Sequence, residues 1–170
     1  MRKQVLRSVR EGFRRELVSD GKFSKLMNSL ESTGADVYVW RFSRDLSFFV
    51  YLLPNPKSYH DSFMVELAWS SGEFPKNAAL QHDQELNCVS DGRIRLPVLW
   101  REQWASAVEP WWELGSPLSA ESSEEFYSEE ETRRRLARVP ETVTDALAKI
   151  KQYALPFFER IVSERELGKH

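Results

Sequence analysis

The stretch that decides the fold reads LSFFVYLL at residues 46–53, PNPKSYHD at 54–61 and SFMVELAW at 62–69. Both flanking runs are rich in β-branched and aromatic residues, and the connection between them has the prolines and polar residues of a turn. The first run is apolar on both of its faces, which indicates a central strand of an antiparallel pair, covered by other elements. The second run contains one carboxylate, Glu66, whose simplest role is pairing with an arginine such as Arg41.

Segments on both sides of this hairpin in the sequence extend the sheet. In residues 36–44 the side chains have the alternating pattern of a third strand, and residues 93–96 can form a fourth. Residues 3–30 have the apolar spacing of a helix, with a break expected at Asp20 and Gly21. These segments predict a sheet preceded by helical structure.

The C-terminal part of the chain has helical periodicity. We expect one helix over residues 128–138, ended by Pro140, and a second over residues 141–167, kinked at Pro156. The sequence therefore predicts an α+β fold: an antiparallel sheet of three to four strands with N- and C-terminal helices packed on one face.

Length and composition limit the class of protein. A chain of 170 residues with 41% apolar residues suits one domain over residues 1–170, with an acidic loop insertion at about residues 116–128. The single cysteine, Cys88, excludes a disulfide framework within the chain and is typical of a reducing compartment. The longest apolar run, residues 48–53, is far shorter than the roughly 20 residues of a membrane span. We expect a cytoplasmic protein that contacts no membrane.

Charge is unevenly distributed along the chain. Residues 1–31 hold eight lysines and arginines against four acids, whereas residues 109–131 hold eight glutamates and no base. On a helix, four of the bases share one face because they recur at spacings of four and three. They are Lys3, Arg7, Arg10 and Arg14. A solvated surface is the simplest interpretation of this face, and nucleic-acid binding through it is an alternative.

No dense catalytic motif is present in the sequence. His60, Asp61, Glu66, His82 and Cys88 are the side chains with useful chemistry, but their spacing matches no known metal motif, and no G-x-S-x-G turn is present. We therefore expect no catalytic residue, no metal site and no cofactor. A small hydrolase that uses Asp61, Glu66, His82 or Cys88 is the enzymatic alternative.

A tryptophan-rich segment precedes the acidic run. Trp111 and Trp112 are consecutive, so in regular structure one of the two lies at the surface, beside Glu113. Large aromatic residues supply much of the energy of protein interfaces, and surrounding acids favour a basic protein partner while repelling nucleic acid. The predicted partner-binding residues are Trp111, Trp112, Glu113, Glu121, Glu124, Glu125, Glu129, Glu130 and Glu131.

The order of several features is shared with a known family. These are VWRFSR at residues 39–44, Cys88 with Arg93 and Arg95 after it, the Trp111-Trp112 pair, and ALPFF at residues 154–158. Over roughly residues 5–162 the chain resembles the bacterial family catalogued as domain of unknown function 4304. The resemblance implies an α+β fold and no established activity. It favours a non-catalytic protein-binding role, such as that of a toxin-neutralising immunity protein.

Overall fold

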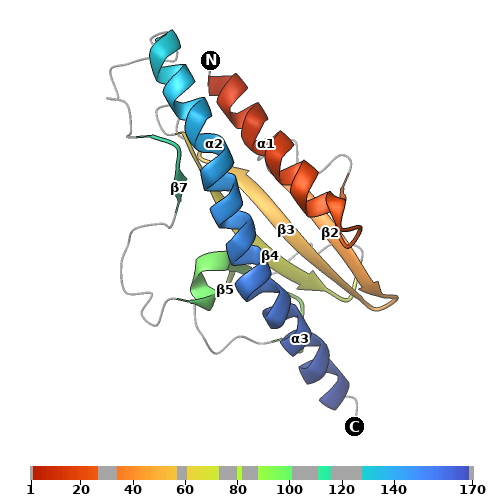
Figure 1. The fold of residues 1–170 in the computed structure, drawn as a ribbon. Coiled ribbons are helices and arrows are strands. Elements are labelled where there is room, and N and C mark those ends of the chain that lie inside the picture. The colour runs from red at the N-terminus through yellow and green to blue at the C-terminus, as the bar shows by residue number, and fades with distance from the viewer. Residues whose placement is uncertain are drawn as a thin grey trace.

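In the computed structural model, helices cover one face of a single β-sheet (Figure 1). Helix α1 (Arg2–Ser19) and helix α2 (Glu129–Lys149) lie side by side, and helix α3 (Leu155–Leu167) continues the line of α2. The α+β class expected from the sequence is confirmed. The structure describes residues 2–26, 34–56, 61–72, 80–81, 88–100, 111–115 and 128–168.

Four longer strands form the body of the sheet. They are β2 (Asp36–Ser43), β3 (Leu46–Pro54), β4 (Ser62–Ser70) and β6 (Gly92–Arg95), each antiparallel to its neighbour. The described residues add three strands of two residues each: β1 (Ser24–Lys25), β5 (Leu80–Gln81) and β7 (Trp112–Glu113). The sheet order is β1-β2-β3-β4-β6-β5, with β7 paired to the start of β4 and β5 parallel to β6. The count exceeds the expected three to four strands because a two-residue strand has no detectable periodicity.

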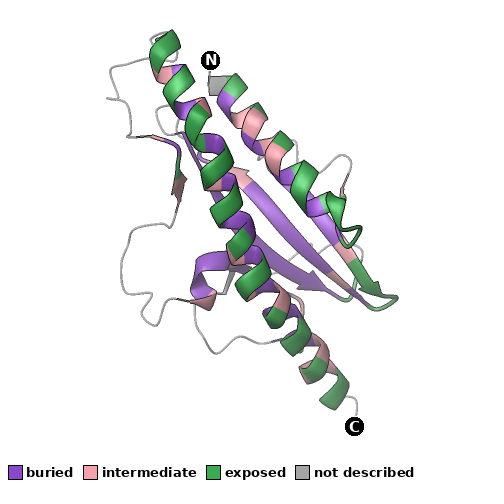
Figure 2. Cartoon of the chain, in the orientation of Figure 1, coloured by how far each residue is buried: buried purple, intermediate pink, exposed green. Residues whose placement is uncertain are grey.

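The face of the sheet toward the helices forms the main core. Alternate residues of β3 and β4, among them Phe48 and Phe63, point to this side and are fully buried (Figure 2). Phe13 of α1 meets Phe63 edge-on, with ring centroids 5.4 Å apart, and Phe158 of α3 stacks on Phe48 at 4.3 Å. These aromatic contacts fix both helical segments on the sheet.

The opposite face of the sheet is buried as well. Val37, Val39, Phe49, Tyr51 and Ala68 form a second apolar cluster, and none of them is more than 4% exposed. The apolar character of β3 on both faces, visible in its sequence, is thus explained by burial on both sides.

Pro140 behaves differently from expectation, whereas the helix does depart from regular α-helical geometry before Pro156. Pro140 lies inside α2 and does not end it. Val139 and Val143 are buried on either side of Pro140, and this packing outweighs a propensity cost of about 3 kcal/mol. Before Pro156 the helix widens into a π-helical turn, η3 (Ile150–Ala154). There the Leu155 N–H donates a hydrogen bond to the Ile150 carbonyl, five residues earlier, which is the spacing of a π-helix.

The helix expected to continue past residue 21 is replaced by a strand. Gly21 has a φ of 74°, a left-handed conformation that ends the helical path, and Ser24–Lys25 then pairs with β2. None of the helices in the described ranges is long and apolar enough to cross a membrane.

Candidate protein-binding surface

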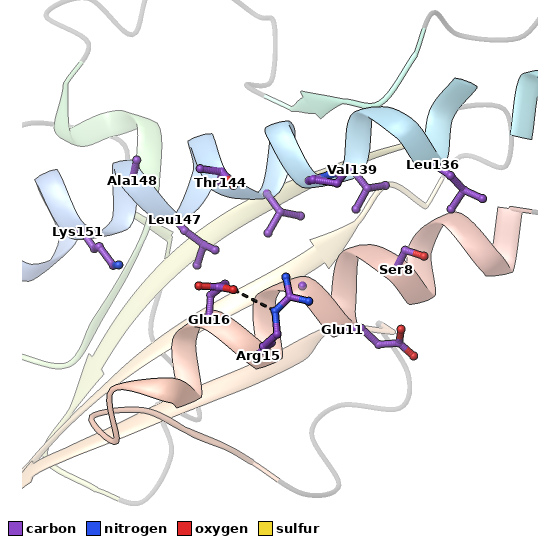
Figure 3. Close-up of a pocket in the computed structure, with 13 residues that line it drawn as sticks. Ser8, Glu11, Arg15, Glu16, Leu136, Val139, Thr144, Leu147, Ala148 and Lys151 are labelled. Atoms are coloured by element: carbon purple, nitrogen blue, oxygen red, sulfur yellow. Dashed lines mark hydrogen bonds and ion pairs between the residues drawn. The ribbon is translucent and has the colours of Figure 1, made fainter. Parts of the chain in front are cut away.

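A groove of about 600 Å³ runs between α1 and α2 and is open to solvent (Figure 3). Its α2 wall is apolar, because Val139 and Leu147 point toward α1, while Arg15 and Glu16 of α1 reach toward α2. The lining residues are Ser8, Glu11, Gly12, Arg15 and Glu16 of α1, and Leu136, Val139, Pro140, Val143, Thr144, Leu147, Ala148 and Lys151 of the α2 segment.

The groove has this form because small residues lie along both helices. At Gly12 an added Cβ would lie 3.3 Å from Val143 Cγ1, so glycine allows the two helices to approach closely at this point. On α2, the exposed side chains of Thr144 and Ala148 are too short to fill the space above the contact. The result is a shallow channel whose floor is apolar.

Pro140 alters the backbone hydrogen bonding of α2 beside the groove. Because proline has no N–H, the carbonyl of Leu136 lacks its usual donor four residues later in the helix. Leu136 and Pro140 both line the groove. The backbone of α2 beside the groove therefore has one carbonyl without the usual helical hydrogen bond.

Charged side chains of both signs form the rim of the groove. Arg15 and Glu16 pair at 3.0 Å, and Glu11 pairs with Arg7 at 2.8 Å. All four side chains are about half exposed or more, so solvent screens each pair and it contributes little to stability. Such pairs can be exchanged for contacts with a partner at low cost.

Three of the predicted acidic residues lie in the first turn of α2. Ser128 caps the helix by accepting a hydrogen bond from the Glu131 N–H at 3.1 Å, and Glu129, Glu130 and Glu131 favour the positive end of the helix dipole. Glu129 and Glu130 are exposed. Glu131 already has two partners within α2, because its carboxylate pairs with Arg134 at 3.2 Å and with Arg135 at 2.8 Å.

A buried ion pair ties this end of α2 to the sheet. Arg135 is 1% exposed, and its Nη1 lies 3.5 Å from Oδ2 of Asp61, which is fully buried. Asp61 immediately precedes β4, and its carbonyl accepts a hydrogen bond from the Leu114 N–H at 2.9 Å. A Cβ on Gly115 would lie 2.9 Å from Cζ of Arg135, so glycine makes room for the guanidinium. The position of α2, and of the groove beside it, depends on this cluster.

The two predicted tryptophan anchors are both half-buried. Trp112 lies parallel to Phe63 with ring centroids 5.7 Å apart, and its indole N–H donates to Asp145 of α2 at 2.9 Å. Trp112 therefore holds β7 against α2. Beside it, Glu113 is exposed. The remaining predicted acids, Glu121, Glu124 and Glu125, lie outside the described residues.

The three residues of the enzymatic alternative that the structure describes, Asp61, Glu66 and Cys88, do not form one site. Asp61 and Cys88 lie on the helix side of the sheet, whereas Glu66 lies on the opposite face, where it pairs with Arg93 and Arg95 instead of the expected Arg41. His82 lies outside the described residues. Within the part of the chain that the structure describes, no three potential metal ligands form a group.

Cys88 is poorly suited to nucleophilic attack. It is fully buried, and burial, followed by the nearby Glu164 carboxylate, raises the pKa of its thiol to about 11. The thiol is therefore protonated near neutral pH, whereas a nucleophilic cysteine needs a lowered pKa.

The basic face of α1 is partly used inside the fold. Arg10 donates to the Gly34 carbonyl at 2.6 Å and lies 3.8 Å from Asp36, while Arg7 pairs with Glu11. Lys3 and Arg14 are exposed. Two of the four bases thus already have internal acceptors.

Comparison of the chain with protein-family models, with curated proteins and with solved structures gives no match. The resemblance to the domain of unknown function 4304 family therefore stays a prediction.

The groove was not predicted from the sequence. A signal for it exists in the spacing of small residues, with Ser8 and Gly12 four apart on α1 and Thr144 and Ala148 four apart on α2. Residues four apart lie on the same face of a helix. Two such pairs of small residues therefore indicate helix faces on which the side chains leave space unfilled.

Proposed function

We propose that this protein works by binding another protein, as a toxin-neutralising immunity protein does, and that the partner docks in the groove between α1 and α2. The observation that carries the proposal is the groove itself, which is open to solvent and bordered by charges. Its base is formed by Val139, Val143 and Leu147, which are buried, and its more accessible apolar lining is the half-buried Leu136 and the exposed Pro140. A hydrophobic centre with a polar rim is the usual anatomy of a protein interface.

The charge of the surface favours a partner with basic groups. The charges that line the groove are balanced, Glu11 and Glu16 against Arg15 and Lys151. The excess of acid lies beside it, where Glu129 and Glu130 are exposed at the start of α2. Glu130 precedes Leu136 by six residues, about 9 Å along a helix, so one partner can reach both. In this proposal the acids accelerate association, and the accessible apolar lining, Leu136 and Pro140, supplies most of the binding energy.

The experiment uses one matched pair of variants. Ala148 and Ala137 are both exposed alanines of α2, but only Ala148 lines the groove. Ala148→Glu places a charge in the groove, whereas Ala137→Glu places the same charge elsewhere on the same helix. Partners captured from a lysate of the native source by the tagged protein are identified by mass spectrometry, and each is then purified and titrated with both variants.

The proposal expects one captured protein to form a stoichiometric complex that Ala148→Glu weakens by at least about tenfold, or 1.4 kcal/mol. Ala137→Glu leaves the affinity within about twofold of the original protein. Equal effects of the two variants, or affinity unchanged in both, would remove the groove from the proposed function.

A further inference from the structure

A second concave site lies at the turn between β2 and β3, the hairpin end of the sheet (Figure 1). Its volume is about 400 Å³, and it is lined by Arg41, Ser43, Arg44, Ser47, Ser71 and Gly72. Among the described residues, neither apolar side chains nor carboxylates contribute to this lining. Such a composition differs from that of the α1–α2 groove and calls for a different ligand.

The sheet register brings the pocket together. Arg41 pairs with Ser47 across β2 and β3, and Ser47 pairs with Ser70 across β3 and β4, so the three lie in one row on the face opposite the helices. The register shifts between Arg41 and Ser43, which marks a β-bulge. Bulges redirect side chains and are common next to binding sites.

The two guanidinium groups lack a carboxylate partner. In the ranges that the structure covers, neither Arg41 nor Arg44 is within ion-pair distance of an acid, and both side chains are exposed. Ser43 Oγ accepts a hydrogen bond from the Asp45 N–H at 3.3 Å, which leaves its own proton for donation. The pocket thus offers many donors and two positive charges.

Two acids lie close to the lining residues: Asp45 of the same turn, which does not line the pocket, and Asp91, which contacts Ser70 and Ser71 and already has its own partners. Asp91 accepts hydrogen bonds from the hydroxyls of Ser70 at 2.6 Å and Ser71 at 3.1 Å, and Arg165 donates to it at 3.3 Å. Burial acts to raise the pKa of Asp91, but these hydrogen bonds outweigh burial and hold the pKa below its usual value. The charge of Asp91 is therefore largely balanced by Arg165, and the positive charge of the pocket remains.

We propose that this pocket binds a small phosphomonoester. Arginine binds phosphate through two parallel hydrogen bonds, and two arginines with the hydroxyls of Ser43 and Ser47 match the several acceptor oxygens of a phosphate better than the two of a carboxylate. A volume of about 400 Å³ is within the size range of small-molecule sites. The site is separate from the groove, so it adds to the proposed protein-binding function and does not depend on it.

The test is a calorimetric titration of the full chain with four probes: inorganic phosphate, glycerol phosphate, a phosphoserine peptide and acetate. The proposal expects phosphate and glycerol phosphate to bind and acetate to bind at least about tenfold more weakly. Arg41→Gln with Arg44→Gln lowers the affinity for glycerol phosphate at least about tenfold. Arg133→Gln, which removes an exposed arginine of α2 outside the pocket, leaves it unchanged.

Several results would overturn the proposal. These are no heat of binding with either phosphate probe, equal affinity of the double variant and the original protein, or an equal loss in Arg133→Gln. Tighter binding of the phosphoserine peptide than of glycerol phosphate would reject a small-molecule ligand. Circular dichroism and thermal unfolding of each variant show whether it is folded, and because both arginines are exposed, no loss of fold is expected.

Discussion

Replacement of Arg135 by methionine tests whether α2 is held to the sheet by a buried ion pair. The side chain is 1% exposed and its partner Asp61 is fully buried, so Arg135→Met leaves a carboxylate in the interior without its cation. Loss of one partner of a buried pair costs about 3–5 kcal/mol. Since 1 kcal/mol shifts the Tm of a chain of this size by about 2–4 °C, the expected fall is on the order of 10 °C.

The neighbouring arginine is the control for this experiment. Arg134 is 66% exposed and pairs with Glu130 and Glu131 at the surface, so Arg134→Met should cost no more than about 1 kcal/mol. Both variants are compared by urea denaturation and thermal unfolding. Adding Asp61→Leu to Arg135→Met removes the stranded charge and should restore at least half of the loss. Equal stability of Arg135→Met and Arg134→Met would refute the argument.

Three further predictions follow from single side chains. Because the pKa of the Cys88 thiol is raised to about 11, about a thousandth of the thiol is thiolate at pH 8. Labelling of Cys88 by a disulfide reagent should therefore be at least about 100-fold slower in the native protein than in urea, and equal rates would contradict the burial of this residue. Trp112→Phe keeps the aromatic contact with Phe63 but loses the hydrogen bond to Asp145. The free energy of unfolding in urea titrations should therefore fall by about 1 kcal/mol, and an unchanged free energy would show that this hydrogen bond contributes nothing. The lowered pKa of Asp91 stabilises the native state at pH values above the ordinary carboxyl pKa of 3.8, and this stabilisation is lost as the pH falls through the pKa of Asp91 in the native state. The free energy of unfolding of Asp91→Asn, measured from pH 7 downward, should therefore depend less on pH than that of the original protein, and an unaltered dependence would contradict the lowered pKa.

The sheet was the most predictable part of the fold. β3 and β4 are long, have strong β propensity and are separated by a turn signal, so local sequence and final structure agree. The two-residue strands were not predictable, because Ser24–Lys25 and Trp112–Glu113 form strands only through their partners on β2 and β4. Such pairing depends on tertiary contacts that no local pattern records.

Helix boundaries were less predictable for a related reason. A proline inside a helical pattern usually ends the helix, but Val139 and Val143 beside Pro140 are buried in the core and keep α2 continuous. The ion pairs show the same limit. Glu66 was expected to pair with an arginine, and it does, but its partners come from β6, which is beside β4 only in the folded sheet.

The candidate site was predictable only in its general character. The acidic start of α2 and the Trp111-Trp112 pair are visible as clusters in the sequence, whereas the groove depends on how two helices far apart in the chain are placed side by side. Gly12 and Val143 meet across 131 positions of sequence (143 − 12), and no local periodicity reports such a contact. The groove had to be found from the packed structure.

The most direct test of the account is hydroxyl-radical footprinting of the protein alone and in complex with its purified partner. Leu136 and Pro140 line the groove, while Leu167, at the end of α3, is 75% exposed and outside it. The account predicts that the partner slows oxidation of Leu136 and Pro140 and leaves Leu167 unchanged. Unchanged oxidation of the groove residues in a stoichiometric complex would contradict it.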